Sequence, residues 1–159
     1  MKLDHSVVML SGFLAASFTA AAIGGVATGQ SVRDWYPTLA KPVWNPPAWL
    51  FGPVWTVLYI AMAVAAWLVW RPAGWAGARL ALTLFMVQLA LNAAWSIIFF
   101  GLRNPGAAFA EVVVLWAAIV GTLVLFWQVS VPAGMLFIPY LAWVSFAAVL
   151  NFTVWRLNL

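Results

Sequence analysis

The chain has 159 residues, of which 67% are hydrophobic and only 6% are charged, with a formal net charge of +4. A soluble domain carries about 25% charged residues because its surface has to be hydrated, so this composition excludes a water-soluble globule and indicates a surface that faces lipid. The length permits a single domain. The absence of cysteine excludes disulfides and thiolate metal sites, and the basic residues are too scattered to form a nucleic-acid patch.

Charge-free apolar stretches predict five transmembrane helices, since a span needs about 20 mostly apolar residues. The expected ranges are 6–27, 46–70, 78–100, 105–128 and 132–156. Membrane strands are excluded because open sheet edges cannot exist in lipid and these runs lack the alternation of a barrel. The sequence therefore predicts an all-α bundle of five transmembrane helices, with residues 1–159 forming one membrane domain.

The first expected helix allows a second interpretation. Lys2 precedes an apolar run that is rich in alanine, as in a cleaved signal peptide. The uncharged run between His5 and Arg33 is longer than the apolar region of an ordinary signal peptide, which favours a span. Small residues recur every four positions along it and predict close helix packing: Gly12, Ala16, Ala20 and Gly24.

Proline and glycine suggest where the helices begin and end. Asn45 is a suitable N-cap for a second helix that begins at the following prolines, and Pro53 is expected to bend this helix near its start. Residues 71–74, Arg-Pro-Ala-Gly, predict a turn between the second and third helices.

Residues 28–45 form the only long connection. A loop of this length in a minimal protein is usually functional, and its proline and aromatic content predicts an ordered lid over one mouth of the bundle. The lid residues of interest are Arg33, Trp35, Tyr36, Lys41 and Trp44.

Polar and aromatic residues share one face on each of three expected helices. The faces comprise Trp55, Tyr59 and Met62 on the second helix, Gln88, Asn92 and Ser96 with Trp95 and Phe99 on the third, and Tyr140, Trp143, Ala147 and Asn151 on the fifth. Turned inward, they would line a mostly apolar pocket with a few polar anchors, as small-molecule sites do. The alternative is that the amides only bond neighbouring helices, and spacing alone does not decide between the two.

Conventional catalytic and metal-binding groups are missing from the sequence. His5 is the only histidine and is expected to be solvated at the N-terminus. Glu111 stands alone near the start of the fourth helix, where it is either a near-surface group reaching headgroups or Arg103, or a proton site. Neither a metal site nor a cofactor is predicted.

Several motifs are similar to those of one known family. They are Lys-Pro-Val-Trp-Asn-Pro-Pro at 41–47 followed by Trp49 and Val-Trp-Thr-Val-Leu-Tyr at 54–59, then Gln88 to Trp95, Phe-Phe-Gly at 99–101, Pro-Tyr-Leu-Ala-Trp at 139–143 and Leu150-Asn151. In these residues the chain resembles the translocator protein family, also called peripheral benzodiazepine receptors or tryptophan-rich sensory proteins. The match covers all five expected helices in order.

The resemblance implies a homodimer of five-helix subunits that binds porphyrins, haem and isoquinoline or benzodiazepine-type drugs, in a multi-pass membrane location such as a bacterial cell envelope. It assigns Trp55, Asn92 and Trp143 to the ligand pocket and Phe51, Tyr59, Gln88, Trp95 and Ala147 to nearby lining positions. Animal members also bind cholesterol, but their motif needs a tyrosine where this chain has Phe152, so sterol binding does not carry over.

Three functions follow as hypotheses. The favoured one is a tetrapyrrole-binding membrane receptor or transporter, in which indoles stack on the macrocycle and Arg33 or Lys41 meets its carboxylates. The second, also implied by the resemblance, is light-dependent porphyrin degradation at Trp55 and Trp143. The third is a small proton-coupled exporter centred on Glu111.

Overall fold

The computed structural model describes residues 2–159, with side chains from His5 onward, and in that part of the chain it contains five long helices and no strand. These are α1 (Lys2–Asp34), α2 (Ala48–Gly77), α3 (Arg79–Ser96), α4 (Pro105–Val129) and α5 (Val131–Leu157), with a short 3₁₀ helix η1 (Tyr36–Thr38) and a π-helix η2 (Ile97–Gly101). Each long helix, α3 taken together with η2, is long and apolar enough to cross a membrane. The predicted all-α, five-helix class is confirmed.

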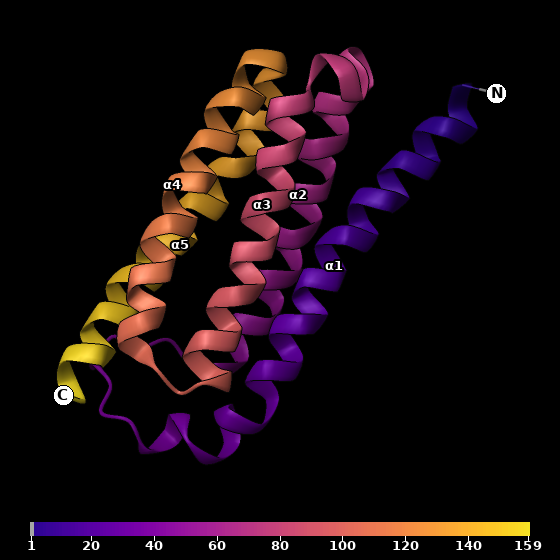
Figure 1. Cartoon of the computed structure of the whole chain (residues 1–159). Helices are drawn as coiled ribbons and strands as arrows, with labels where there is room; N and C mark the ends of the chain where they lie inside the picture. The colour runs from indigo at the N-terminus through magenta and orange to yellow at the C-terminus, as the bar shows by residue number, and fades with distance from the viewer. Residues whose placement is uncertain (1) are drawn as a thin grey trace.

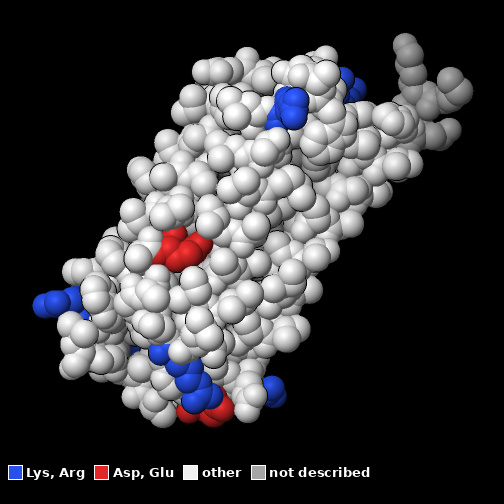
Figure 2. Space-filling model, viewed as in Figure 1, with Lys and Arg blue, Asp and Glu red and all other residues white. Residues whose placement is uncertain are grey.

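The helices run up and down beside one another, and α1 lies at one edge of the bundle (Figure 1). The connection from α1 to α2 passes beneath the end of the bundle at which the C-terminus lies, and the N-terminus is at the opposite end (Figure 1). Basic side chains lie toward the two ends of the visible face, and uncharged atoms cover most of the length between them (Figure 2). This distribution suits a bundle whose middle faces hydrocarbon and whose ends face headgroups.

Aromatic rings fill the core where α3, α4 and α5 meet. Phe85 stacks on Phe126 with ring centroids 6.0 Å apart, and Phe126 meets Phe137 edge-on at 5.0 Å. All three side chains are fully buried. This half of the bundle is therefore solid, and empty space is left to the half nearer the lid.

The first helix is longer than its apolar run predicts, because it continues through residues 28–34 to Asp34. Polar side chains in this stretch find partners without breaking the helix: Thr28 donates to the carbonyl of Gly24, and Ser31 donates across to that of Phe100. Arg33 consequently lies in the last turn of α1, and the predicted connection 28–45 is wrong in its first seven residues. The true connection begins at Trp35.

The second helix also differs at both ends. It begins at Ala48 with Pro47 in the N-cap position, so the prediction that Asn45 caps it is wrong. The Asn45 side chain instead accepts a hydrogen bond from the hydroxyl of Tyr36. At the other end the predicted turn at 71–74 is confirmed only at its last residue. The backbone stays helical past Arg71 and Pro72 and leaves the helical path at Gly74, whose φ of +63° suits glycine, before α2 ends at Gly77.

The third helix ends in a π-helical turn that sequence periodicity does not reveal. Residues Ile97–Gly101 follow Ser96 directly, and this wider turn carries Phe99 and Phe100. Their rings contact each other with centroids 4.8 Å apart and both also contact Trp95. The π-helix therefore gathers three rings at the lid end of α3.

Replacing Gly134 by alanine tests the close approach of α4 and α5. A Cβ added there would lie 2.5 Å from Cε3 and 3.0 Å from the Cα of Trp127, so the helices have to separate. We expect Gly134→Ala to lower stability by about 1–3 kcal/mol, seen as a lower melting temperature of the purified protein in detergent.

The matched control is Gly12→Ala on α1, where an added Cβ meets nothing within 4 Å. It should keep or slightly raise the melting temperature, because alanine favours a helix over glycine. Equal melting temperatures for the two variants would contradict the packing described here.

Candidate functional site

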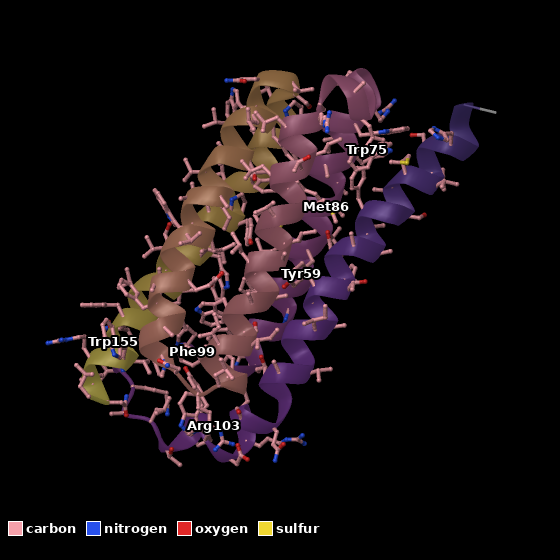
Figure 3. All side chains as sticks on the ribbon, viewed as in Figure 1. Tyr59, Trp75, Met86, Phe99, Arg103 and Trp155 are labelled. Carbon is pink, nitrogen blue, oxygen red and sulfur yellow. The ribbon has the colours of Figure 1, made fainter. Side chains whose placement is uncertain are left out.

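A cavity of about 650 Å³ lies inside the bundle between α1, α2, α5 and the lid end of α3 with η2. This volume falls within the usual range for small-molecule sites, about 300–1,000 Å³. In Figure 3, Tyr59 lies about midway along the bundle and Phe99 lies nearer the lid, which marks the part of the bundle that the cavity occupies.

The walls of the cavity are rich in aromatic rings and carry no charge. Three indoles line it, those of Trp55, Trp95 and Trp143. Further rings come from Phe51, Tyr59, Phe99, Phe100 and, on the lid side, Tyr36. Among the lining residues in the described part of the chain there is no Lys, Arg, His, Asp or Glu. The cavity therefore suits a flat apolar ligand more than a highly charged one.

A chain of hydrogen bonds closes the inner end of the cavity. Tyr59 donates its hydroxyl to Oδ1 of Asn92 at 2.5 Å, and Nδ2 of Asn92 donates to the hydroxyl of Tyr140 at 2.9 Å. Tyr140 in turn donates to Oε1 of Gln88 at 2.8 Å, and Nε2 of Gln88 lies 3.7 Å from the sulfur of Met62. All five side chains are buried. The network joins α2, α3 and α5 in one register.

A second polar link ties the indole of Trp95 in place. Its Nε1 donates to Oδ1 of Asn151 at 2.9 Å, and Asn151 donates its Nδ2 to the carbonyl of Pro105 at 2.8 Å. The indole nitrogen of Trp143, by contrast, is buried and has no hydrogen-bond partner among the described residues. Trp143 lines the cavity, so one of the indoles in its wall carries a donor that no described group of the protein satisfies.

The structure brings together most of the residues singled out from the sequence. Those that line the cavity are Phe51, Trp55, Tyr59, Asn92, Trp95, Trp143 and Ala147. Gln88 lies behind the wall, where it serves the hydrogen-bond network. Sequence reasoning missed the wall formed by α1, which consists largely of small residues such as Ala21, Ala22 and Gly25. Of the recurring small residues predicted on this helix only Gly24 lines the cavity, so that pattern did not indicate this wall.

Five tryptophans lie well inside the apolar runs of the sequence, namely Trp55, Trp67, Trp95, Trp116 and Trp143, and they divide into two groups. Trp67 and Trp116 do not line the cavity: Trp67 donates to the backbone and side-chain oxygens of Ser6 at 3.1 Å, and Trp116 donates to Ser145 at 2.8 Å. Both therefore join neighbouring helices. The other three tryptophans well inside apolar runs are the three indoles of the cavity.

The lid residues take different positions. Trp35 packs edge-on against Phe99 at 5.8 Å, and Trp44 packs against Phe146 at 5.9 Å. Tyr36 alone of the five predicted lid residues lines the cavity. Burial raises the pKa of its hydroxyl, which keeps the proton that is donated to Asn45.

Lys41 stabilises the lid through contacts with the backbone of the lid itself. Its ammonium group donates to the carbonyl oxygens of Leu39 at 2.7 Å and Tyr36 at 2.8 Å, and lies 3.4 Å from that of Pro37. It also sits 4.9 Å from the centre of the Tyr36 ring. An ammonium has three donors, and these contacts occupy them. The structure therefore gives Lys41 a role in lid geometry, whereas Arg33 is exposed and donates only to Gly29 in its own helix.

The C-terminus holds the lid as well. The amide side chain of Asn158 accepts from the backbone nitrogen of Ala40 and donates to its carbonyl, both at 2.9 Å. Arg103 forms an ion pair with Asp34 at 3.4 Å beside the start of the connection. Contacts from Asn158 and from Arg103 thus hold the connection and its start against the end of the bundle.

Glu111 and His5 lie outside the cavity lining. Both carboxylate oxygens of Glu111 are buried without a hydrogen-bond partner among the described residues. The expectation that Glu111 reaches Arg103 is wrong, because Arg103 pairs with Asp34. The ring of His5 lies 5.3 Å from that of Trp70 at the other end of the bundle.

Comparison with known proteins gives one family. The model of the TspO/MBR family matches residues 13–156. The Tryptophan-rich protein TspO of Chlorobaculum tepidum is 47% identical over 137 residues, which cover 85% of this chain and 86% of that protein. Protein CrtK of Rhodobacter capsulatus is 44% identical over 147 residues, 89% of each chain. The human Translocator protein is 46% identical over 132 residues, 82% of this chain and 78% of that one.

Replacing Tyr140 by phenylalanine tests the hydrogen-bond network. The change leaves Oε1 of Gln88 and Nδ2 of Asn92 without their partner, and an unsatisfied buried polar group costs about 1–3 kcal/mol. We expect a lower melting temperature in detergent. The control is Thr153→Val, which removes an exposed hydroxyl bonded only to its own helix and should melt like wild type. A Tyr140→Phe protein as stable as this control would show that the network does not hold the helices.

Proposed function

The chain belongs to the TspO/MBR family and is a multi-pass integral membrane protein, and from this premise we propose that its cavity binds a tetrapyrrole such as protoporphyrin or haem. The proposal makes the protein a membrane receptor or transporter for a hydrophobic ligand. The observation that carries it is the uncharged cavity of about 650 Å³ walled by the indoles of Trp55, Trp95 and Trp143.

A porphyrin is a flat aromatic disc, and indole and phenyl rings favour such a surface. Aromatic pairs contribute about 0.5–1.5 kcal/mol each beyond the apolar area they bury. The unpartnered indole nitrogen of Trp143 would gain a partner from an acceptor on the ligand. The carboxylates of the porphyrin find no cation in the wall, so they belong at the rim, where headgroups and water can solvate them.

The proposal extends to other flat apolar ligands. Isoquinoline and benzodiazepine-type compounds share the aromatic surface and hydrogen-bond acceptors that this cavity accommodates, and a homodimer stays the expected assembly. Sterol binding is not proposed, because Phe152 has no hydroxyl and its ring packs against Phe109 at 5.0 Å and Trp155 at 6.1 Å.

A second candidate function is light-dependent degradation of a bound porphyrin. It is favoured by one observation, that the two indoles assigned to it, Trp55 and Trp143, both line the cavity and would both adjoin a bound ring. In this reaction light would excite the bound porphyrin and the indoles would act as electron donors. Such photochemistry requires neither an acid–base pair nor a metal. The exporter hypothesis has less support, since Glu111 is not among the lining residues.

Titration with protoporphyrin tests binding through the quenching of tryptophan fluorescence. We expect saturable quenching of the wild type in detergent or nanodiscs, and about tenfold weaker affinity for Trp143→Ala, which corresponds to about 1.4 kcal/mol. The control is Trp49→Ala, because Trp49 is 72% exposed and does not line the cavity. Quenching that never saturates, or that is equally weakened in both variants, would indicate partitioning into detergent and contradict the proposal.

An illumination experiment distinguishes the receptor hypothesis from the enzyme hypothesis. Porphyrin absorption spectra are followed in light and in darkness for wild type and for Trp143→Phe, which keeps a ring in the wall but removes the indole. As a receptor, the wild type should bind the porphyrin with no product formed faster in light than by the porphyrin in detergent alone. A light-dependent product that requires wild-type protein and declines several-fold in Trp143→Phe would establish the enzymatic alternative.

A further inference from the structure

The side of the cavity between α1 and α2 is bordered by small residues. Ala22 and Gly25 of α1 and Gly52 and Thr56 of α2 line the cavity, and each is exposed. Because the side chains on both helices are this small and exposed, the wall is thin at this place.

The register of the two helices places these residues opposite one another. α1 and α2 are antiparallel, and the ring of Phe18 lies 6.3 Å from that of Tyr59. Gly25 follows Phe18 by seven residues and Gly52 precedes Tyr59 by seven, so the two glycines stand at the same level. In the view of Figure 1, α1 is the edge helix of the bundle, and the long helices that it packs against are α2 and α3.

The seam is not filled by neighbouring side chains. A Cβ built on Gly25 or on Gly52 meets no atom within 4 Å outside its own helix, in contrast to Gly24, where it would lie 3.0 Å from the hydroxyl of Ser96. Gly24 packs against α3, whereas the glycine next to it borders open space. At these two glycines the boundary between α1 and α2 is therefore not filled by a neighbouring side chain.

The opposite route, through the lid, is fastened at several points. The ammonium group of Lys41 contacts three carbonyl groups of the connection. The side chain of Asn158 is hydrogen-bonded to both the backbone nitrogen and the carbonyl of Ala40, and the Tyr36 hydroxyl is bonded to Asn45. A ligand arriving from water would have to break these contacts. A ligand arriving from the bilayer would have to displace only lipid chains from a gap lined by glycine, alanine and threonine.

We propose that the gap between Gly25 and Gly52 is a lateral portal, through which flat, mostly apolar molecules dissolved in the bilayer enter the cavity. The inference rests on the proposed function, since it assumes that the cavity takes such a ligand. It adds the source of the ligand, which is the hydrocarbon phase and not the aqueous phase beyond the lid.

A reversible plug at Gly52 tests the portal. The natural chain has no cysteine, so Gly52→Cys provides a single thiol that a bulky methanethiosulfonate reagent modifies and a reductant frees. The same protein, in nanodiscs, is mixed with protoporphyrin, and tryptophan quenching is followed by stopped flow. We expect the plug to slow both association and dissociation at least tenfold, and reduction to restore both rates.

The matched control is Gly12→Cys, on an exposed part of α1 that is equally free of neighbours but does not line the cavity. Its plug should leave the rates unchanged. Asn158→Ala, which removes both bonds to Ala40, should also leave them unchanged if the lid is not the entrance.

The outcomes separate the portal from the binding function. Saturable binding with rates that the Gly52→Cys plug does not change, or rates that rise in Asn158→Ala, would overturn the portal and leave the binding proposal standing. A plug that lowers affinity by speeding dissociation alone would mean that position 52 only lines the cavity, and would also overturn the portal. Absence of saturable quenching in unmodified wild type would overturn the binding function, and the portal with it.

Discussion

The free-energy cost of leaving a polar group unsatisfied inside a bilayer shapes this bundle. Tyr59, Asn92, Tyr140 and Gln88 avoid that cost by bonding to one another, and each bond crosses between helices. Single interhelical hydrogen bonds in membranes contribute modestly, about 0.6 kcal/mol on average. Their directionality matters more, because a slipped register would leave several amides and hydroxyls unpaired in hydrocarbon. The network thereby sets the positions of α2, α3 and α5, and with them the indoles one turn nearer the lid.

The fold class followed from the sequence because charge is so costly in lipid that charge-free runs mark the spans. The ends of the helices did not follow, since a backbone stays helical wherever its hydrogen bonds are made, in lipid or out of it. α1 continues to Asp34, with Thr28 bonded to a carbonyl group of its own helix and Ser31 to the carbonyl group of Phe100, and α2 passes Arg71 and Pro72 to bend at Gly74. Charges locate the membrane boundary, whereas capping and glycine locate the helix ends.

Periodicity predicted the inward faces of three helices, but it could not distinguish hydrogen-bonded packing from a cavity wall. The structure contains both arrangements: Gln88 takes part in the hydrogen-bond network, whereas Trp55 and Trp143 line the cavity. Two features had no sequence signal of their own. The three carbonyl partners of Lys41 are backbone atoms, and the wall contributed by Gly25 is made by the absence of a side chain.

An uncharged cavity and a ligand with two carboxylates are compatible because of where the cavity lies. It extends from Tyr59, about midway along the bundle, to Tyr36 on the lid, so its outer end is close to the level of the headgroups (Figure 3). A porphyrin in a bilayer keeps its ring among acyl chains and its carboxylates at the surface, because burying an ionised carboxylate costs several kcal/mol. Such a molecule moving sideways between α1 and α2 crosses no hydrocarbon with its charged edge. The amphipathic shape of the ligand and the position of the gap at Gly25 and Gly52 therefore impose the same path, with the ring entering the wall of indoles and the acids remaining at the rim.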